Sequence, residues 1–357
     1  MEKEIKHFDY IDALRGIAIL MVVVAHVGQI TFQSGLVLNI TSLGVYGVQL
    51  FFMISALTLF FSYNQRKDVD SENTKRNFFI RRFFRIAPGF YLAIFIYSLV
   101  LIFNNYINYS DKIANFSVFK TIIYSIFLGL LYEPAMSYLP FGGWTVQVEM
   151  AFYILIPMLF NKIISLKKSI LLFIFSVVAY FFLDKILLIL TNNNPLASFY
   201  LLFPSQLPIF FLGIILYFLL KNSNINKSRY FLWSIYLIIS IIVCRKYFSW
   251  LPEQILVSIG LAGIIFSMAA KPVPLLVNRI TKFYGKISYS LYLSHFLVVM
   301  SSWYVYKYTN YFWQINRISA FCILLVIVLL IGTVISYFSY LYVELPGIKL
   351  GKKIIRK

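Results

Sequence analysis

The sequence predicts an all-α, polytopic membrane protein. Hydrophobic residues make up 61% of its 357 residues and charged residues only 13%, whereas roughly a quarter of a soluble domain is charged. Apolar runs long enough to cross a bilayer recur from end to end. The formal net charge of +19 comes from basic residues in the short connections between these runs. This distribution is typical of positive-inside topology, so we expect a lipid bilayer, and no nucleic acid, as a partner.

Eleven apolar segments are candidate helices. In chain order they are 13–32, 45–63, 84–103, 118–132, 144–161, 169–190, 203–220, 230–247, 253–270, 287–306 and 318–341. Segment 118–132, which contains "FKTIIYSIFLGLLY", is short for a span of about 20 residues.

The distribution of Lys and Arg indicates how that short segment behaves. If 118–132 re-enters without crossing, ten helices span, with 24 Lys and Arg inside and seven outside. If it crosses, the count becomes 14 inside and 17 outside. The positive-inside rule therefore favours about ten transmembrane helices plus one re-entrant segment, with both termini cytoplasmic.

No part of the chain is predicted to form a separate soluble domain, so we expect a single transmembrane domain over 1–357. The first apolar run follows a leader with charges of both signs and lacks a small-residue cleavage site, so it is expected to be a retained span. Cys244 and Cys322 stand alone in apolar segments. They are expected to be packing residues, and they predict neither a disulfide nor a metal site.

The stretch "DALRGIAILMVVVAH" places two ionisable groups inside the first predicted span. Arg15 and His26 lie eleven residues apart, which puts them on one helical face with about 16 Å of rise between them. Ionisable groups within a span generally face the bundle interior and mark function. Asp12 can pair with Arg15. The alternatives are an interfacial Arg15 and an interhelical hydrogen bond from His26.

A carboxylate lies in "GGWTVQVEMAFY". Glu149 comes about six residues into a span that is predicted to start outside, so it is expected at nearly the depth of His26. A carboxylate beside an imidazole fixes the tautomer and raises the basicity, which is a common way to build a general base. The alternative is a Glu149 neutralised by burial or paired with an arginine.

Three arginines, Arg81, Arg82 and Arg85, open the third predicted span in "RRFFRIAPGFY". Spacing of four places Arg81 and Arg85 on one face, where guanidinium groups suit phosphate. The alternative is an anchor near anionic lipid.

Six motifs in order, covering Arg15 to Pro346, resemble acyltransferase family 3, the membrane proteins that O-acylate bacterial surface polysaccharides. They are "RGIAILMVVVAH", "GVQLFFMISA", "RRFFRIAPGFY", "WTVQVEMAFY", "YGKISYSLYLSH" and "YVELP". Ala56 stands where the family usually has Gly, and Thr145 where it has Ser. No segment of this sequence is expected to form the soluble esterase-like domain that is fused to some members.

The resemblance implies an acyltransferase that uses acyl-CoA, usually acetyl-CoA, from the cytoplasmic side, with no permanently bound cofactor and no metal. The acceptor would be a hydroxyl of a lipid-linked or surface polysaccharide, such as the O-antigen of lipopolysaccharide or an exopolysaccharide. The location would be the bacterial cytoplasmic (inner) membrane.

The same resemblance implies roles for particular residues. The catalytic residues would be His26, as general base, with Glu149 and Arg15. Residues that bind acyl-CoA or line its channel would be Arg81, Arg82, Arg85, Ser55, Trp144, Tyr292 and His295. His295 could equally make a core hydrogen bond, and Glu344 is expected to be a structural partner for a basic loop.

Two other interpretations fit a basic, aromatic-rich, polytopic chain. A glycan flippase or other transporter is one, although neither repeat symmetry nor paired Gly/Pro-broken helices are evident. A catalytically inactive homologue that acts as an envelope scaffold is the other. The presence of Arg15, His26 and Glu149 in the expected motifs argues against it.

Overall fold

The computed structural model describes residues 8–108, 117–129, 139–190, 199–221, 234–236, 238–239, 252–313 and 315–356. Within this part of the chain the structure is helical and has no strand. The elements used below are α1 (Asp9–Thr31), α2 (Leu36–Ser42), α3 (Gly47–Asp70), α4 (Thr74–Asn108), α5 (Val118–Ser125), α7 (Trp144–Phe160), α8 (Leu166–Leu190), α9 (Phe203–Lys221), α11 (Glu253–Ala270), α12 (Arg279–Trp313), α13 (Arg317–Ser339) and α14 (Leu345–Arg356). Shorter 3₁₀ turns cover Leu43–Tyr46, Ser71–Asn73 and Phe199–Leu201.

The all-α membrane fold predicted from hydropathy is confirmed. Among the described residues, seven helical segments are long and apolar enough to cross a bilayer, and α7 is a shorter apolar helix. Predicted segment 230–247 lies largely outside the described residues, so the total of about ten spans stays a prediction. The sequence did not predict the helices α2 and α14.

Segment 118–132 begins with a short helix. α5 has eight residues, so it rises only about 12 Å, far less than the roughly 30 Å of bilayer hydrocarbon. The chain then turns at Phe127, which has a φ of 61°, and the Phe127 ring stacks on Phe90 of α4 with centroids 5.0 Å apart. This helix is too short to cross a bilayer by itself, and the re-entrant course of segment 118–132 stays a prediction.

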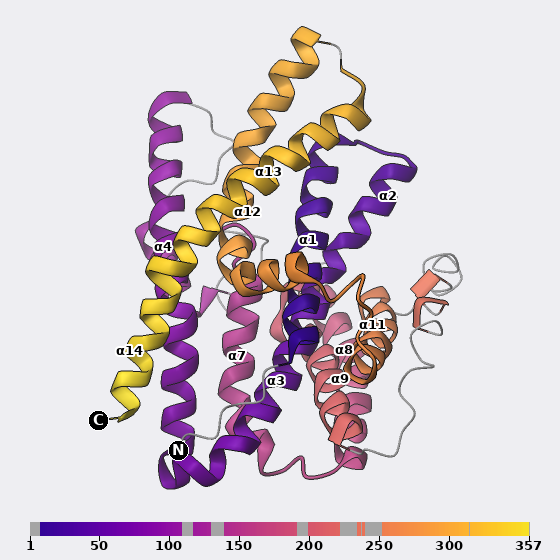
Figure 1. Ribbon diagram of the computed structural model, residues 1–357, viewed down its shortest axis with the longest axis vertical. Helices are drawn as coiled ribbons and strands as arrows, with labels where there is room; N and C mark the ends of the chain where they lie inside the picture. The colour runs from indigo at the N-terminus through magenta and orange to yellow at the C-terminus, as the bar shows by residue number, and fades with distance from the viewer. Residues whose placement is uncertain are drawn as a thin grey trace.

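Helix α8 presents apolar side chains to its surroundings almost everywhere along its length. Phe175, Phe182 and Ile189 are 69%, 66% and 74% exposed. In water such a surface would be strongly unfavourable, whereas lipid tails solvate it. Figure 1 shows α8 grouped with α9 and α11 on one side of the bundle. We therefore assign α8 to the lipid-facing periphery.

Helices α1 and α12 pack so closely that their backbones touch. A Cβ added at Gly16 of α1 would lie 1.9 Å from the carbonyl oxygen of Thr281, and one added at Gly285 of α12 would lie 1.9 Å from that of Asp12. Small residues at helix crossings allow this approach in membrane bundles. The pairing places α1, which carries Arg15 and His26, directly against α12.

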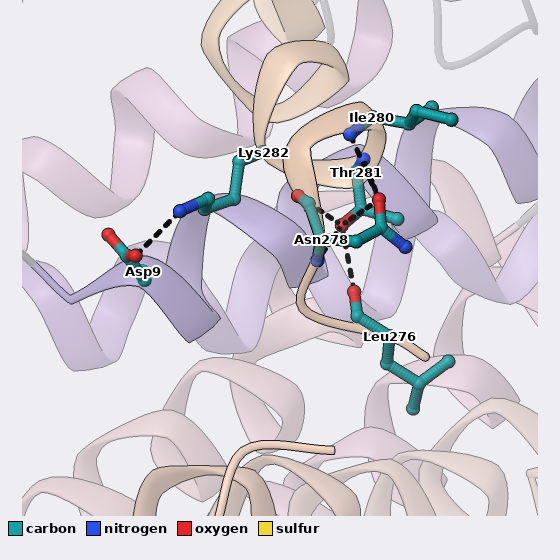
Figure 2. Close-up of polar contacts among 6 residues, drawn as sticks. All are labelled: Asp9, Leu276, Asn278, Ile280, Thr281 and Lys282. Atoms are coloured by element: carbon teal, nitrogen blue, oxygen red, sulfur yellow. Dashed lines mark hydrogen bonds and ion pairs between the residues drawn. The ribbon is translucent and has the colours of Figure 1, made fainter. Parts of the chain in front are cut away.

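Polar contacts hold the start of α12 against α1. The side-chain oxygen of Asn278 accepts hydrogen bonds from the backbone N–H groups of Ile280 (2.9 Å) and Thr281 (3.0 Å), which caps the helix. Lys282 Nζ lies 2.7 Å from Asp9 Oδ2 of α1. Figure 2 shows both sets of contacts.

Helix α13 continues into α14 through a π-helical turn, Tyr340–Glu344. Figure 1 shows α14 running beside α4. Gly347 makes this contact possible, because a Cβ there would lie 2.7 Å from the carbonyl oxygen of Phe84. The C-terminal helix therefore belongs to the bundle and forms part of the wall described below.

The ten-span topology predicts which connections are accessible from each side. Single cysteines or reporters within 36–42 and 192–196 should be labelled from outside, and those within 68–74 and 222–228 from inside. Reporters near 112 and 140 should both be outside. A membrane-impermeant thiol reagent applied to intact cells and to inverted vesicles measures this. Opposite sides for 112 and 140 would contradict the ten-span topology.

Candidate active site

A cavity inside the bundle, called the central cavity here, has a volume of about 80 Å³. Five helices supply its polar side chains. They are Arg15 of α1, Ser55 and Thr58 of α3, Arg82 and Arg85 of α4, Thr145, Glu149 and Tyr153 of α7, and Ser288, Tyr289 and Tyr292 of α12. The structure thus brings together six of the ten residues predicted for the site: Arg15, Ser55, Arg82, Arg85, Glu149 and Tyr292.

Glu149 is held by two hydroxyl groups. Ser55 Oγ donates to Glu149 Oε1 at 2.5 Å, and the Tyr153 hydroxyl donates to the same oxygen at 2.6 Å. Tyr153 lies four residues after Glu149 on α7, where side chains meet on one helical face. These bonds fix the carboxylate in a cavity that three arginines also line.

The central cavity carries an excess of positive charge. Its charged lining side chains are the guanidinium groups of Arg15, Arg82 and Arg85 and the carboxylate of Glu149. The one described hydrogen bond of Arg82 is a long one, 3.5 Å to Ser62 Oγ. Buried charges that lack a full set of partners are costly. The arrangement therefore favours an anionic ligand.

Arg81 is directed elsewhere. Its guanidinium pairs with the carboxylate of Asp70 at the end of α3, and it lines neither cavity described here. The sequence grouped Arg81 with Arg85, four residues apart, but the pair that shares the cavities is Arg82 and Arg85. Arg81 does not line the cavities with Arg85 because its guanidinium group pairs with Asp70.

A second cavity of about 460 Å³, called the terminal cavity here, lies where α1 and α14 begin. It is lined in part by Asp12, Gln65, Lys286, Tyr340 and Glu344. Arg15, Thr58, Arg82 and Arg85 line both cavities. These four residues therefore form a shared wall between the two spaces.

Glu344 belongs to that terminal cavity rather than to a basic loop. Its side chain is 3% exposed, and Ser290 Oγ of α12 donates to Glu344 Oε2 at 3.2 Å. The π-helical turn places it there, and π-turns inserted in α-helices often occur at functional sites. Glu344 and Arg85 put opposite charges on the same cavity lining.

His26 does not pair with Glu149, so that expectation was wrong. His26 Nδ1 lies 3.0 Å from the Gln29 side-chain oxygen, one turn further along α1. Its ring packs on Phe296, with centroids 4.2 Å apart, and on His295, with centroids 5.4 Å apart. His26 lines neither the central nor the terminal cavity.

The start of α7 explains the error in depth. α7 has 17 residues, so it is about 25 Å long and shorter than the hydrocarbon layer. It begins inside the bundle, where the Tyr292 hydroxyl donates to the Gly142 carbonyl at 3.0 Å. Glu149 therefore lines the central cavity together with Arg15, and His26 does not line it.

The remaining predicted residues lie near the central cavity. Tyr292 lines it, and its ring centroid is 5.4 Å from that of His295, which links the cavity to the two histidines. Trp144, at the start of α7, packs at an angle against Tyr200 and edge-on against Phe52, with ring centroids 5.5 Å and 6.3 Å apart. Trp144 packs against aromatic rings and lines neither cavity.

Three residues that contact predicted site residues were not predicted from the sequence. Gln29 lies three residues after His26 and Tyr153 four residues after Glu149, so helical spacing could have found both. Thr58, whose hydroxyl lies 3.4 Å from Arg15 Nη2, comes from a different helix, and no sequence signal joins these two residues. Among the described residues there is no cluster of three His, Cys, Asp or Glu that could hold a metal.

The fold and the cavities define an integral membrane helix bundle with a buried, charged site. The family model described as an acyltransferase domain matches residues 8–337, and the chain therefore belongs to acyltransferase family 3. This confirms the family indicated by the six motifs and makes the protein a membrane acyltransferase.

Curated relatives are similar at low identity. The chain is 28% identical over 302 residues to a protein of Acidianus two-tailed virus named "Putative acetyltransferase ORF330", with 82% of this chain and 84% of the relative covered. It is 25% identical over 375 residues to a "Putative O-acetyltransferase" of Staphylococcus aureus (strain COL). That match covers 99% of this chain but only 59% of the staphylococcal protein. No solved structure matches the chain significantly.

Proposed function

We propose that the protein is an O-acyltransferase that moves an acetyl group from cytoplasmic acetyl-CoA to a hydroxyl of a cell-envelope polysaccharide, such as an O-antigen or exopolysaccharide. The observation that carries this proposal is the shared wall of Arg15, Thr58, Arg82 and Arg85 between two cavities. A transferase that joins substrates from opposite sides of a membrane needs a path of this kind.

The donor would enter through the terminal cavity. Coenzyme A carries phosphate groups, and guanidinium groups bind phosphate with paired, charge-assisted hydrogen bonds. Arg82 and Arg85 line this cavity with their guanidinium groups. Donor phosphates would lie on the terminal side of the wall, and the acyl end would extend through the central cavity past Tyr292 toward the two histidines.

His26 would act as the general base. Its Nδ1 faces the Gln29 side-chain oxygen, so Nδ1 carries the hydrogen and Nε2 is free to accept a proton. In the transfer, the sugar hydroxyl oxygen forms a bond to the acyl carbon and its proton passes to His26 Nε2. The carbon–sulfur bond then breaks, and the proton is returned to the thiolate of coenzyme A.

The proposed location is the bacterial cytoplasmic membrane with both termini in the cytoplasm. Two observations support it. The start of α1 and the start of α14 line the same cavity, and the basic α14 belongs to the side on which the sequence places most of the Lys and Arg. The terminal cavity would then open toward the compartment that holds acyl-CoA.

An assay with labelled donor tests the function. Membranes that contain the protein should transfer label from [¹⁴C]acetyl-CoA to envelope polysaccharide taken from a deletion strain. They should transfer little to polysaccharide from the parent strain, where the hydroxyls are already occupied. NMR of the polysaccharide identifies the acylated position. Equal acetyl content in the deletion and parent strains, with no label transferred, would refute the proposal and favour a transporter.

A further inference from the structure

Two histidines, far apart in the sequence, lie against each other at the α1–α12 contact. The centroids of the His26 and His295 rings are 5.4 Å apart, and both rings pack on Phe296. His295 is fully buried, at 0% exposure, whereas His26 is half-buried. The backbone approach at Gly16 and Gly285 keeps the two helices close enough for the rings to meet.

The contacts of His295 indicate which of its two ring nitrogens carries the hydrogen. Its Nδ1 lies 2.6 Å from the backbone carbonyl oxygen of Tyr292. A carbonyl oxygen only accepts, so Nδ1 carries the hydrogen, and in the neutral ring Nε2 is then an acceptor. His295 Nε2 is buried and has no hydrogen-bond partner among the described residues. Buried polar atoms without a partner are rare and call for an explanation.

His26 has the same arrangement. Gln29 accepts from Nδ1, which leaves Nε2 as an acceptor. Two acceptor nitrogens cannot hydrogen-bond to each other, and no bond between the two rings is present in this uncharged state. When His26 takes up a proton, its Nε2 becomes a donor. The ring planes lie 29° apart with centroids separated by 5.4 Å, and a rotation of the rings would let this N–H point at the acceptor Nε2 of His295.

We propose that His295 is a positioning residue that stabilises protonated His26 by accepting a hydrogen bond from its Nε2–H. The inference rests on the proposed function, in which His26 takes the hydroxyl proton. The proton comes from the attacking hydroxyl and stays on His26 Nε2, held toward His295 Nε2, while the oxygen–carbon bond forms. It is delivered to the sulfur when the carbon–sulfur bond breaks. His295 gains no proton and remains neutral throughout.

Two substitutions separate hydrogen-bond acceptance from packing. His295→Phe keeps a ring in the buried space but removes the acceptor. His295→Gln keeps an amide donor for the Tyr292 carbonyl and an oxygen acceptor. We expect His295→Phe to lower kcat roughly 10- to 100-fold, the effect of losing a hydrogen bond to a charged group, with KM for acetyl-CoA and acceptor unchanged. His295→Gln should recover most of the kcat.

The measurements are steady-state kinetics on purified protein, with folding checked by gel filtration and thermal stability. A folded His295→Phe variant with wild-type kcat would overturn the proposal, as would equal loss of kcat in folded Phe and Gln variants. If His295→Phe does not fold, His295→Leu takes its place in the comparison. Activity retained in His26→Ala would instead reject His26 as the base. An inactive His26→Ala beside a fully active His295→Phe rejects only the role of His295.

Discussion

Replacing His26 with alanine should reduce O-acylation by roughly 10²–10⁴-fold, the usual contribution of a positioned general base. A sugar hydroxyl is a weak nucleophile at neutral pH, and His26 Nε2 is the nitrogen left free to take its proton by the bond from Nδ1 to Gln29. The measurement is the acetyl content of purified polysaccharide from deletion strains that express each variant, with protein amount determined by immunoblot.

A matched control separates chemistry from packing. Val24 lies on the same helix and is also only partly buried, so Val24→Ala should retain activity. Gln29→Ala should have an intermediate effect on O-acylation. It removes the hydrogen bond that keeps the hydrogen on His26 Nδ1, but the imidazole itself remains. Near-normal acetylation by a well-expressed His26→Ala variant would exclude His26 from this role.

Removing either arginine of the shared wall should impair donor use. Arg82→Ala and Arg85→Ala should each raise KM for acetyl-CoA roughly 10- to 100-fold, since a hydrogen bond to a charged group is worth about 1.5–3 kcal/mol. Lysine should rescue only partly, because an ammonium cannot form the paired bonds of a guanidinium. Initial rates at varied acetyl-CoA, with acceptor saturating, give the KM values.

Arg81 provides the internal control for that experiment. It lies next to Arg82 in the sequence but pairs with Asp70 and lines neither cavity. Arg81→Ala should therefore leave KM for acetyl-CoA nearly unchanged. If all three alanine variants insert normally and keep full activity, the three arginines are membrane anchors only. If Arg81→Ala is as impaired as the other two, the shared wall is not the donor site.

Hydropathy alone predicted most of the helices. The predicted 203–220 and 253–270 correspond to Phe203–Lys221 and Glu253–Ala270. This works because a bilayer requires backbone hydrogen bonds to be satisfied within the segment, so a long apolar run has to be a helix. Helix α14 was not predicted because it is basic. Its contact with α4 through Gly347 cannot be predicted from a local sequence pattern.

Side-chain partners were predicted well only where they are close in the sequence. Asp12 and Arg15, three residues apart on α1, do lie near each other, at 3.9 Å. The predicted partner of His26 was wrong, because it depended on the depth at which α7 begins. The hydrogen bond from the Tyr292 hydroxyl to the Gly142 carbonyl holds the start of α7 against α12, and it joins residues 150 positions apart.

The sequence by itself determined that this is a helical membrane protein, which family it belongs to and which ionisable residues its apolar helices carry. Only the tertiary structure decided how those residues combine: Glu149 with Ser55 and Tyr153, and His26 with His295. The physical reason is that periodicity and hydropathy are local properties of the chain. Helix crossings depend on close backbone contacts such as those at Gly16 and Gly285, which join residues far apart in the sequence.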